Sequence, residues 1–369
     1  MQGVLHRAQP LPNNPAIAPR DPSGRLLLVG AGTRGRMWAQ VVAERGDCVI
    51  AGVVDPSAAA RLAFEAEHPG LPWFPDLEAA LASGGYEAAL LVTPPDGHLS
   101  QCRRLFAAGL PVLAEKPLAA DLADTVAIID AADAAGCPLS VGLNFRFLPV
   151  SQALRAWLTG NRMGKPGFGQ FRYLRNRDGR RPGINRYPLH MRHPMMLEQT
   201  IHHLDLIRYC HGAEVEVVSC RSWNPSWSMY AHDANVHCLL TLSDGVEVNY
   251  FGTWSGGWNM PGFEWRIDCE DGVVIQRELH SDLAFARRSD TDLTPVALPD
   301  ARPYYDDSIA LLGAFRAALR GDGPLPCDGR DHLRSLAICF AGIESSSTDR
   351  AIRMRDFHAS HGLDRLLSD

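Results

Sequence analysis

The sequence predicts an α/β protein, with a doubly wound parallel sheet first and then an α+β domain whose large, mostly antiparallel sheet leaves one face open. Three observations predict this fold class. Continuous apolar runs alternate with helical segments up to about residue 145, a glycine-rich turn joins the first run to the first helix, and polar and apolar residues alternate from about residue 166. Strands buried on both faces are continuously apolar, whereas strands with one solvated face alternate.

Length and composition narrow the class of protein. The 369 residues are enough for two domains with separate cores, and we expect an N-terminal arm at 1–24, a first domain at 25–147 and a second at 148–369. The net charge of −6 disfavours nucleic acid as a partner. No apolar run reaches the roughly 18 residues of a membrane span. Nine cysteines without a CxxC pair are typical of reduced thiols in a cytoplasmic protein.

The first half alternates between predicted strands and predicted helices. Five strands are expected at 26–30, 48–55, 88–93, 111–117 and 138–145, and helices at 36–46, 57–68, 97–109 and 121–136. A parallel sheet of this kind binds its ligand beyond the carboxyl ends of the strands. Residues that directly follow a strand are therefore the candidates for a binding site.

The turn after the first strand has the spacing of a dinucleotide-binding loop. Gly30 suits the tight turn, Gly32 lets the backbone approach a pyrophosphate, and Gly35 allows close packing of helix and strand. The N-terminus of the following helix offers free N–H groups to that pyrophosphate, so Thr33 and Arg34 are expected beside the cofactor.

Asp55 ends the second strand, 20 residues after Gly35. A carboxylate there accepts hydrogen bonds from the adenosine ribose and repels a 2′-phosphate, which favours NAD over NADP. Arg34, Arg36 and Arg61 keep NADP as the less favoured alternative. The competing interpretation of the whole motif is a plain turn followed by a surface aspartate.

Candidate site residues also stand at the ends of the third, fourth and fifth strands: Thr93, Pro94 and His98, then Glu115 and Lys116, then Asn144 and Arg146. The first five are expected around the ribose and nicotinamide, and the last two in the substrate pocket. An ammonium at Lys116 could hold negative charge on a reacting oxygen. The alternative for Lys116 is a surface lysine, and the alternative for Arg146 is a salt bridge.

The second half reads as a helix at 151–160 and then mainly as strands. Strands are expected at 168–175, 214–223, 234–245, 246–257, 262–272 and 273–279, and further helices at 197–212, 305–321 and 330–346. A large antiparallel sheet with an open face often pairs with another subunit, so we expect a homo-oligomer, a dimer or a tetramer.

The stretch LEQTIHHLDLIRY at 197–209 places two histidines between two acids. On an α-helix Glu198, His202 and Asp205 share a face, whereas His203 is turned away by about 100°. Three interpretations compete: a satisfied core histidine, a proton-transfer residue, and a metal site with the ligands His190, His193, Glu198 and His202. The dinucleotide loop favours proton transfer without a metal, because hydride transfer from a carbinol needs a base for the hydroxyl proton.

The chain resembles the glucose–fructose oxidoreductase/inositol dehydrogenase (Gfo/Idh/MocA) family from about residue 25 to 350. The resemblance rests on VGAGTRGRMWAQ, VTPPDGHLSQCRRLFAAGLPVLAEKPLA, GLNFRF, IHHLDLIRY and FEWRIDCEDGVV. It implies a catalytic lysine at Lys116 in EKP and a catalytic histidine at His202, with Asp205 as the trailing acid. Glu198 stands where the family pattern has aspartate, and Thr200 where it has glycine. HMRHPMM replaces the family's glycine-rich run, and these departures concern the substrate more than the reaction class.

Together these features predict an NAD-dependent oxidoreductase acting on the CH–OH group of a sugar, a cyclitol or a sugar derivative. His202 is expected to handle the hydroxyl proton, Lys116 to polarise the oxygen, and Glu198 to orient the substrate or His202. One alternative is a redox-neutral, NAD-dependent enzyme that cleaves glycosides. The other is a non-catalytic NAD sensor, which the presence of both Lys116 and His202 disfavours.

Seven arginines lie between residues 172 and 192, against a single acid, Asp178. They stand at positions 172, 175, 177, 180, 181, 186 and 192. One interpretation is a solvated basic loop or a subunit contact. The other is that one or two of them bind a carboxylate or phosphate of the substrate, which arginine forks do well.

Overall fold

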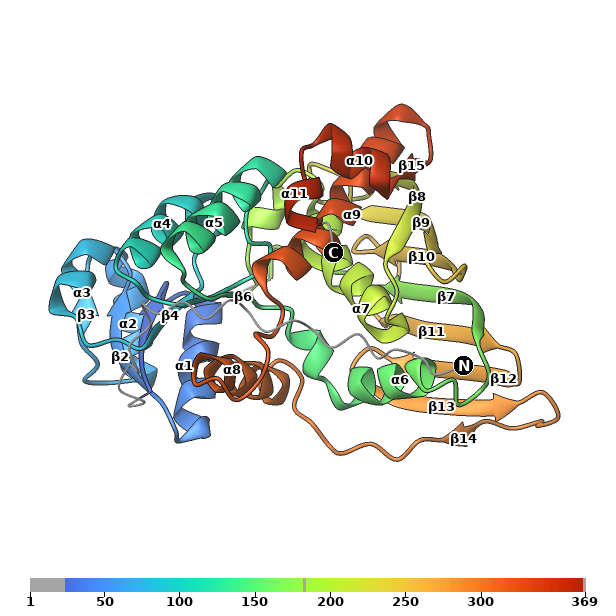
Figure 1. The fold of residues 1–369 in the computed structure, drawn as a ribbon, viewed down its shortest axis with the longest axis horizontal. Coiled ribbons are helices and arrows are strands. Elements are labelled where there is room, and N and C mark those ends of the chain that lie inside the picture. The colour runs from blue at the N-terminus through green and yellow to red at the C-terminus, as the bar shows by residue number, and fades with distance from the viewer. Residues whose placement is uncertain (1–23, 182–183, 368–369) are drawn as a thin grey trace.

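The computed structural model describes residues 24–181 and 184–367, and two sheets organise this part of the chain (Figure 1). The arm predicted for residues 1–24 lies, except for Gly24, outside the described residues. The predicted fold class is confirmed, with a parallel sheet first and a mostly antiparallel sheet second.

The first sheet has six parallel strands in the order β3-β2-β1-β4-β5-β6, one more strand than the sequence indicated. The strands are β1 Arg25–Val29, β2 Val49–Val54, β3 Trp73–Phe74, β4 Ala88–Leu91, β5 Val112–Ala114 and β6 Leu139–Val141. The additional strand, β3, has only two residues at the sheet edge and no apolar run to reveal it. The central strands β1 and β4 are buried except for Arg25, because helices cover both faces of the sheet.

The helices of the first domain follow the strands in the doubly wound pattern: α1 Thr33–Arg45, α2 Ala58–Glu67, α3 Leu77–Ser83, α4 His98–Ala107 and α5 Leu122–Ala135. Helix α3 was not predicted, although Asp76 marks its start by accepting a hydrogen bond from Ala79 N–H, as N-cap residues do. The strand order reverses between β1 and β4, and the crevice at such a switch point is where this fold binds its ligands.

The second sheet has nine strands in the order β14-β13-β12-β11-β7-β10-β9-β8-β15. Its strands are β7 Pro166–Leu174, β8 Val215–Trp223, β9 Asn235–Leu242, β10 Glu247–Thr253, β11 Gly262–Cys269, β12 Gly272–Glu278, β13 Ser281–Arg287, β14 Thr294–Pro295 and β15 Ile352–Arg353. All neighbouring strands are antiparallel except β7 and β10. The central strands alternate between buried and exposed residues, as expected for a sheet with one open face.

Within residues 24–181 and 184–367, helices cover only one face of this sheet. Figure 1 shows α6 Pro149–Thr159, α7 Ile201–His211 and α9 Gly329–Thr348 lying over the same face. Helix α8, Asp306–Leu319, instead lies beside α1 of the first domain, where Arg45 Nη1 donates to the Ile309 carbonyl at 2.9 Å. The short helices α10 Met354–Ser360 and α11 Asp364–Leu367 complete the described chain. The last third of the sequence therefore contacts both domains.

The predicted helix at 197–212 differs from an ordinary α-helix in its first part. Residues Met195–Thr200 form a π-helix, and α-helical geometry starts only at Ile201. A π turn adds a residue to the turn and is frequent at functional sites. The Glu198 carbonyl accepts a hydrogen bond from Lys116 Nζ at 3.0 Å, so the widened turn has a partner in the other domain.

Candidate active site

A cleft of about 450 Å³ lies at the carboxyl ends of β1, β2, β4 and β5, between the two domains. Twelve of the residues predicted for the site line it: Gly30, Gly32, Thr33, Arg34, Asp55, Thr93, Pro94, Glu115, Lys116, Asn144, Glu198 and His202. Gly35, His98 and Arg146 are not part of the lining. The cleft thus brings together the end of the first sheet and the π turn of the second domain.

The glycine-rich turn has backbone requirements that only glycine meets. Gly30 has a φ of 103°, and a Cβ there would lie 2.9 Å from the Val92 carbonyl oxygen. A Cβ on Gly35 would lie 2.1 Å from the Gly30 carbonyl oxygen, so helix α1 could not approach the strand. A Cβ on Gly32 would meet nothing within 4 Å, and the N-terminus of α1 has no side-chain cap. Open space before uncapped N–H groups fits a pyrophosphate.

Asp55 is fixed by backbone groups at the edge of the cleft. Its Oδ2 accepts from Ala31 N–H at 2.8 Å and its Oδ1 from Ser57 N–H at 2.9 Å. The three arginines that kept NADP as an alternative cofactor each have a carboxylate partner: Arg34 pairs with Glu115, Arg36 with Glu67 and Arg61 with Glu65. These pairs leave the carboxylate of Asp55 as the charge at this edge of the cleft, where it would suit the hydroxyls of an adenosine ribose.

Lys116 joins the two domains across the cleft. Its Nζ lies 3.0 Å from Glu198 Oε2, and the side chains of both residues are nearly buried. Among the described residues, Glu198 Oε1 is buried and has no hydrogen-bond partner. The sequence suggested that Glu198 orients the substrate or His202, and in the structure its side chain pairs with Lys116. A carboxylate at this point balances the ammonium that faces the cleft.

His202 lies at the start of α7 and stacks on Phe145, with ring centroids 4.4 Å apart. Its Nδ1 is buried and has no hydrogen-bond partner in the part of the chain that the structure describes. Burial, with the nearby Lys116 ammonium, holds the pKa of His202 well below its usual range. The ring is therefore neutral at pH 7 and able to accept a proton.

His203 faces the sheet instead of the cleft. It is fully buried, and its two ring nitrogens bond the Tyr250 hydroxyl at 2.9 Å and Gln199 Nε2 at 3.0 Å. Burial lowers the pKa of His203 to about 3. Neighbouring histidines thus occupy different environments, one in the cleft and one within the core.

Arg146 and Asp205 form a buried ion pair rather than part of the cleft. Two guanidinium nitrogens of Arg146 donate to the two carboxylate oxygens of Asp205, and a third donates to Asp331. Asp205 lies three residues after His202 on α7, but it pairs with this buried guanidinium and does not line the cleft. Of the two interpretations of Arg146, the structure shows the salt bridge.

His98 and Asn144 also have partners within the protein. His98 is buried, and its ring nitrogens bond the carbonyls of Leu118 and Thr93 at 3.0 and 2.9 Å, so it holds the loop that carries Thr93. Asn144 lines the cleft, but its amide nitrogen donates to Asp307. Burial raises the pKa of Asp307 to about 6.

Two of the seven arginines noted in the sequence, Arg175 and Arg177, also line the cleft. The structure adds lining residues that the sequence did not single out: Val92, Pro95, Phe145, Asn185, Tyr187, Gln199, Trp254 and Tyr304. Trp254 follows a strand of the second sheet, and no local pattern indicates that it reaches this cleft.

The proposed metal ligands do not gather around one point. His193 Nδ1 bonds Asp233 at 3.2 Å, while Glu198 contacts Lys116. Within residues 24–181 and 184–367, no group of three or more His, Cys, Asp or Glu side chains is arranged to hold a metal ion. The described part of the chain likewise contains no helix long and apolar enough to cross a membrane.

Two family models match the chain. Residues 25–143 match the oxidoreductase family with an NAD-binding Rossmann fold, and residues 151–275 match the GFO/IDH/MocA C-terminal domain. The chain is 26% identical over 341 residues to an inositol 2-dehydrogenase of Pseudarthrobacter chlorophenolicus, covering 90% of this chain and 96% of that protein.

Solved structures share the fold. An oxidoreductase from Agrobacterium radiobacter, in complex with NAD⁺, L-tartaric acid and magnesium, has a TM-score of 0.82 at 20% identity and covers 90% of this chain and 99% of its own. The WlbA dehydrogenase from Bordetella pertussis, in complex with NADH and UDP-GlcNAcA, has a TM-score of 0.76 at 23% identity and covers 89% and 98%. With both family models matched in order along one chain, the protein belongs to the Gfo/Idh/MocA family of NAD-binding oxidoreductases.

Proposed function

We propose that the protein is a dehydrogenase that oxidises a secondary alcohol of a sugar, a cyclitol or a related polyol with NAD, or runs the reverse reduction. The observation that carries this proposal is the position of Lys116 and His202 in one cleft with the glycine-rich turn and Asp55. The relatives named inositol 2-dehydrogenase support a polyhydroxylated substrate.

The residues of the cleft fit NAD and divide the work of the reaction. Gly30, Gly32 and the N-terminus of α1 would hold the pyrophosphate, and Asp55 the adenosine ribose. NAD supplies the hydride acceptor when bound. As the carbinol C–H bond breaks, His202 takes the hydroxyl proton and Lys116 stabilises the charge on the oxygen, so that a ketone forms. Between turnovers, the carboxylate of Glu198 balances the positive charge of Lys116.

The test of this proposal is a screen of polyols, sugars and sugar acids with the purified full-length chain, followed by the absorbance of NADH. Oxidation of at least one polyol, with one NADH formed per ketone, is the expected result. Release of a glycoside's leaving group without net NADH would contradict it, and would instead support the glycoside-cleaving alternative.

We expect NAD to bind at least tenfold more tightly than NADP, a difference of about 1.4 kcal/mol. The carboxylate of Asp55 bonds the ribose hydroxyls and repels a 2′-phosphate. Asp55→Ala should reduce the difference in affinity between the two cofactors, mainly by weakening the binding of NAD. Fluorescence titration of both cofactors measures the two affinities. Equal or tighter binding of NADP by the wild-type protein would show that the assignment is wrong.

We further propose a cytoplasmic homo-oligomer, a dimer or tetramer, in which residues 25–147 bind the cofactor and residues 148–369 hold the substrate and the subunit contact. All nine cysteines are buried, in keeping with a reducing compartment. The uncovered face of the second sheet presents apolar side chains, including Phe168, Trp223 and Leu239, which are 53%, 40% and 51% exposed. Apolar groups gathered on one face are typical of an interface.

Leu239→Glu should therefore shift the protein toward the monomer, because a charge would be buried in the interface. Light scattering during size-exclusion chromatography measures the mass. Leu62→Glu is the control, since Leu62 is 75% exposed on α2, away from this sheet. A monomeric wild type, or an equal shift in mass for both variants, would rule out this face as the subunit interface.

A further inference from the structure

Two arginines at the substrate end of the cleft have no acidic partner. Arg175 and Arg177 both line the cleft, and among the described residues no carboxylate lies within 4.0 Å of either guanidinium. The other two cations of the lining are each paired: Arg34 with Glu115 and Lys116 with Glu198. The substrate end therefore has an excess of two positive charges.

The spacing of these arginines follows from the extended backbone that carries them. Arg175 N–H donates to the Thr253 carbonyl at 3.0 Å and Arg177 N–H to the Trp254 carbonyl at 2.9 Å. Side chains alternate along extended backbone, so residues two apart point to the same side. Asn176, between them, lines a second hollow instead. Two of the seven arginines thus reach the cleft.

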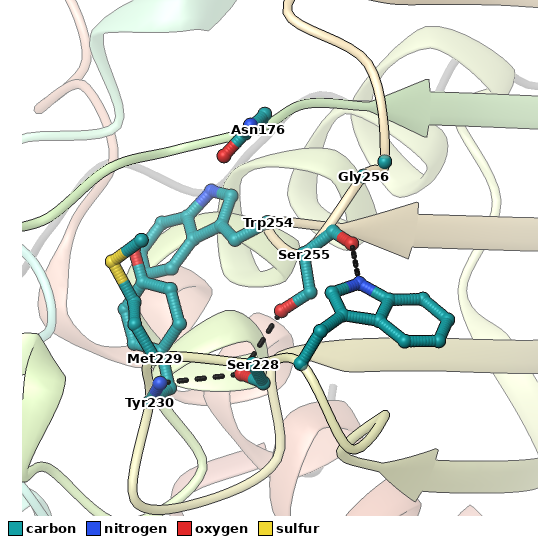
Figure 2. A pocket seen from close by; sticks show the side chains of 9 residues that line it. Asn176, Ser228, Met229, Tyr230, Trp254, Ser255 and Gly256 are labelled. Carbon is teal, nitrogen blue, oxygen red and sulfur yellow. Dashed lines mark hydrogen bonds between the residues drawn. The ribbon is translucent and has the colours of Figure 1, made fainter.

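Neutral groups hold Arg177 in place. Its guanidinium carbon lies 4.5 Å from the ring centroid of Trp254, and its Nη1 donates to the Tyr230 hydroxyl at 3.1 Å. Figure 2 shows Trp254 and Tyr230 in the wall of the second hollow, about 270 Å³ in volume, where Trp227 Nε1 donates to the Ser255 carbonyl. The guanidinium is oriented without its charge being neutralised.

Arg175 has the same character. Burial lowers the pKa of Arg175, but the neighbouring phenols of Tyr173, Tyr304 and Tyr230 outweigh burial and raise that pKa. Phenols are neutral at pH 7, because their pKa is ordinarily about 10. A cation that faces a binding cleft and has only neutral partners is available for an anion of the ligand.

We propose that the substrate is a polyol that carries an oxyanion, a carboxylate or a phosphate, and that Arg175 and Arg177 bind this group. The planar forks of the two guanidinium groups match such oxygens. Asn185 and Tyr187 line the same wall and add neutral donors. The inference rests on the proposed function, since the alcohol of the same molecule would be the one placed against Lys116 and His202.

Binding to the NAD-loaded, full-length protein tests the proposal by calorimetry without turnover. D-Gluconate, D-glucuronate and D-glucose 6-phosphate are the anionic probes, and D-glucitol is the neutral one. We expect at least one anionic probe to bind at least tenfold more tightly than D-glucitol, and this preference to shrink with added salt. The relative affinities of the acids and the phosphate identify the oxyanion. Equal or weaker binding of all the anionic probes would overturn the proposal.

Variants assign the preference to the two arginines. Arg175→Gln and Arg177→Gln should each weaken the binding of the preferred anion about tenfold to a hundredfold, as loss of a charge-assisted hydrogen bond does. Arg177→Lys should restore part of the affinity by returning the charge. Arg180→Gln is the matched control, since Arg180 is an exposed arginine of the same segment outside the cleft lining. If Arg177→Gln fails to fold, the anion affinity of Arg175→Gln tests the proposal. Unchanged anion binding in Arg175→Gln overturns the proposal.

The two proposals fail in different ways. If the protein is not a dehydrogenase, no probe yields NADH, while anion binding still depends on Arg175 and Arg177. If the anion site is absent, NADH forms best with neutral polyols at every salt concentration, and the glutamine variants behave like the wild type.

Discussion

Replacing His202 by alanine is expected to lower kcat about 10²–10⁴-fold, the usual contribution of a positioned acid–base group. The neutral ring of His202 lines the cleft, and in the proposed reaction it accepts the hydroxyl proton as the hydride leaves the alcohol carbon. Lys116→Ala should cause a loss of similar size. NAD binding should survive in both variants, because neither side chain holds the pyrophosphate. Steady-state kinetics of NADH formation and a separate NAD titration measure the two effects.

The two losses should not add in the double variant, since both groups act on one oxygen in one transition state. His203→Ala is the control: it removes the bonds to Tyr250 and Gln199, which costs stability, but should leave kcat of the folded protein near the wild-type value. Chelators should leave activity unchanged. Loss of turnover in His203→Ala but not in His202→Ala would show that the wrong histidine has been assigned.

The pH profile provides a second measure of His202. Its pKa is held below the usual value by burial and by Lys116, so the base form persists as the pH falls through 6.5. Oxidation should therefore keep its kcat/KM through the pH range in which an exposed histidine would be protonated, and decline only in more acid solution. A sharp loss centred at pH 6.5 would indicate a solvated histidine.

Asp205→Ala is expected to lower the free energy of unfolding by about 3–5 kcal/mol, the cost of breaking a buried ion pair. The side chains of Arg146 and Asp205 are 11% and 2% exposed, and Ser335 Oγ donates to Asp205 at 2.7 Å. Without the carboxylate, the buried guanidinium loses its main partner. Denaturant unfolding, followed by circular dichroism, measures the change.

A matched pair on the surface provides the control. Arg330 and Asp133 also join two helices through two hydrogen bonds, but their side chains are 46% and 43% exposed. Arg330→Ala should cost less than about 1 kcal/mol. Replacing the buried pair together, as Arg146→Met with Asp205→Leu, should recover much of the loss. If Asp205→Ala and Arg330→Ala lower the free energy of unfolding equally, burial does not explain the contribution of the Arg146–Asp205 pair to stability.

The sequence predicted the parts of the site that depend on local order. The glycine-rich turn, Asp55 and Lys116 follow directly after strands, and the ends of parallel strands meet at one edge of the sheet. Their position could be inferred once the strands were recognised. The same holds for the open-faced second sheet, because alternation along each strand is a local pattern.

The parts that were missed depend on contacts between distant segments. Arg146 follows a strand as Lys116 does, yet a carboxylate 59 residues away draws it into the core. The excess of arginine before residue 192 was visible, but only backbone pairing with the last residue of β10 and the residue after it places Arg175 and Arg177 in the cleft. No periodic pattern in the sequence predicts the π turn at Met195–Thr200. Its hydrogen-bond partner is Lys116, which lies in the other domain and is distant in the sequence.

The π turn also affects how substrate specificity at this site could change among related proteins. It joins the arginine-rich loop to the helix that carries His202, and it holds one residue more than an α-helical turn would need. Each residue of a helix corresponds to about 100° of rotation. A change of a single residue in the length of this turn therefore re-aims Glu198 and the loop before it, while Ile201–His211 stays packed on the sheet. Insertion or deletion of a residue here would let a relative acquire a different substrate while His202 stays in place on its helix.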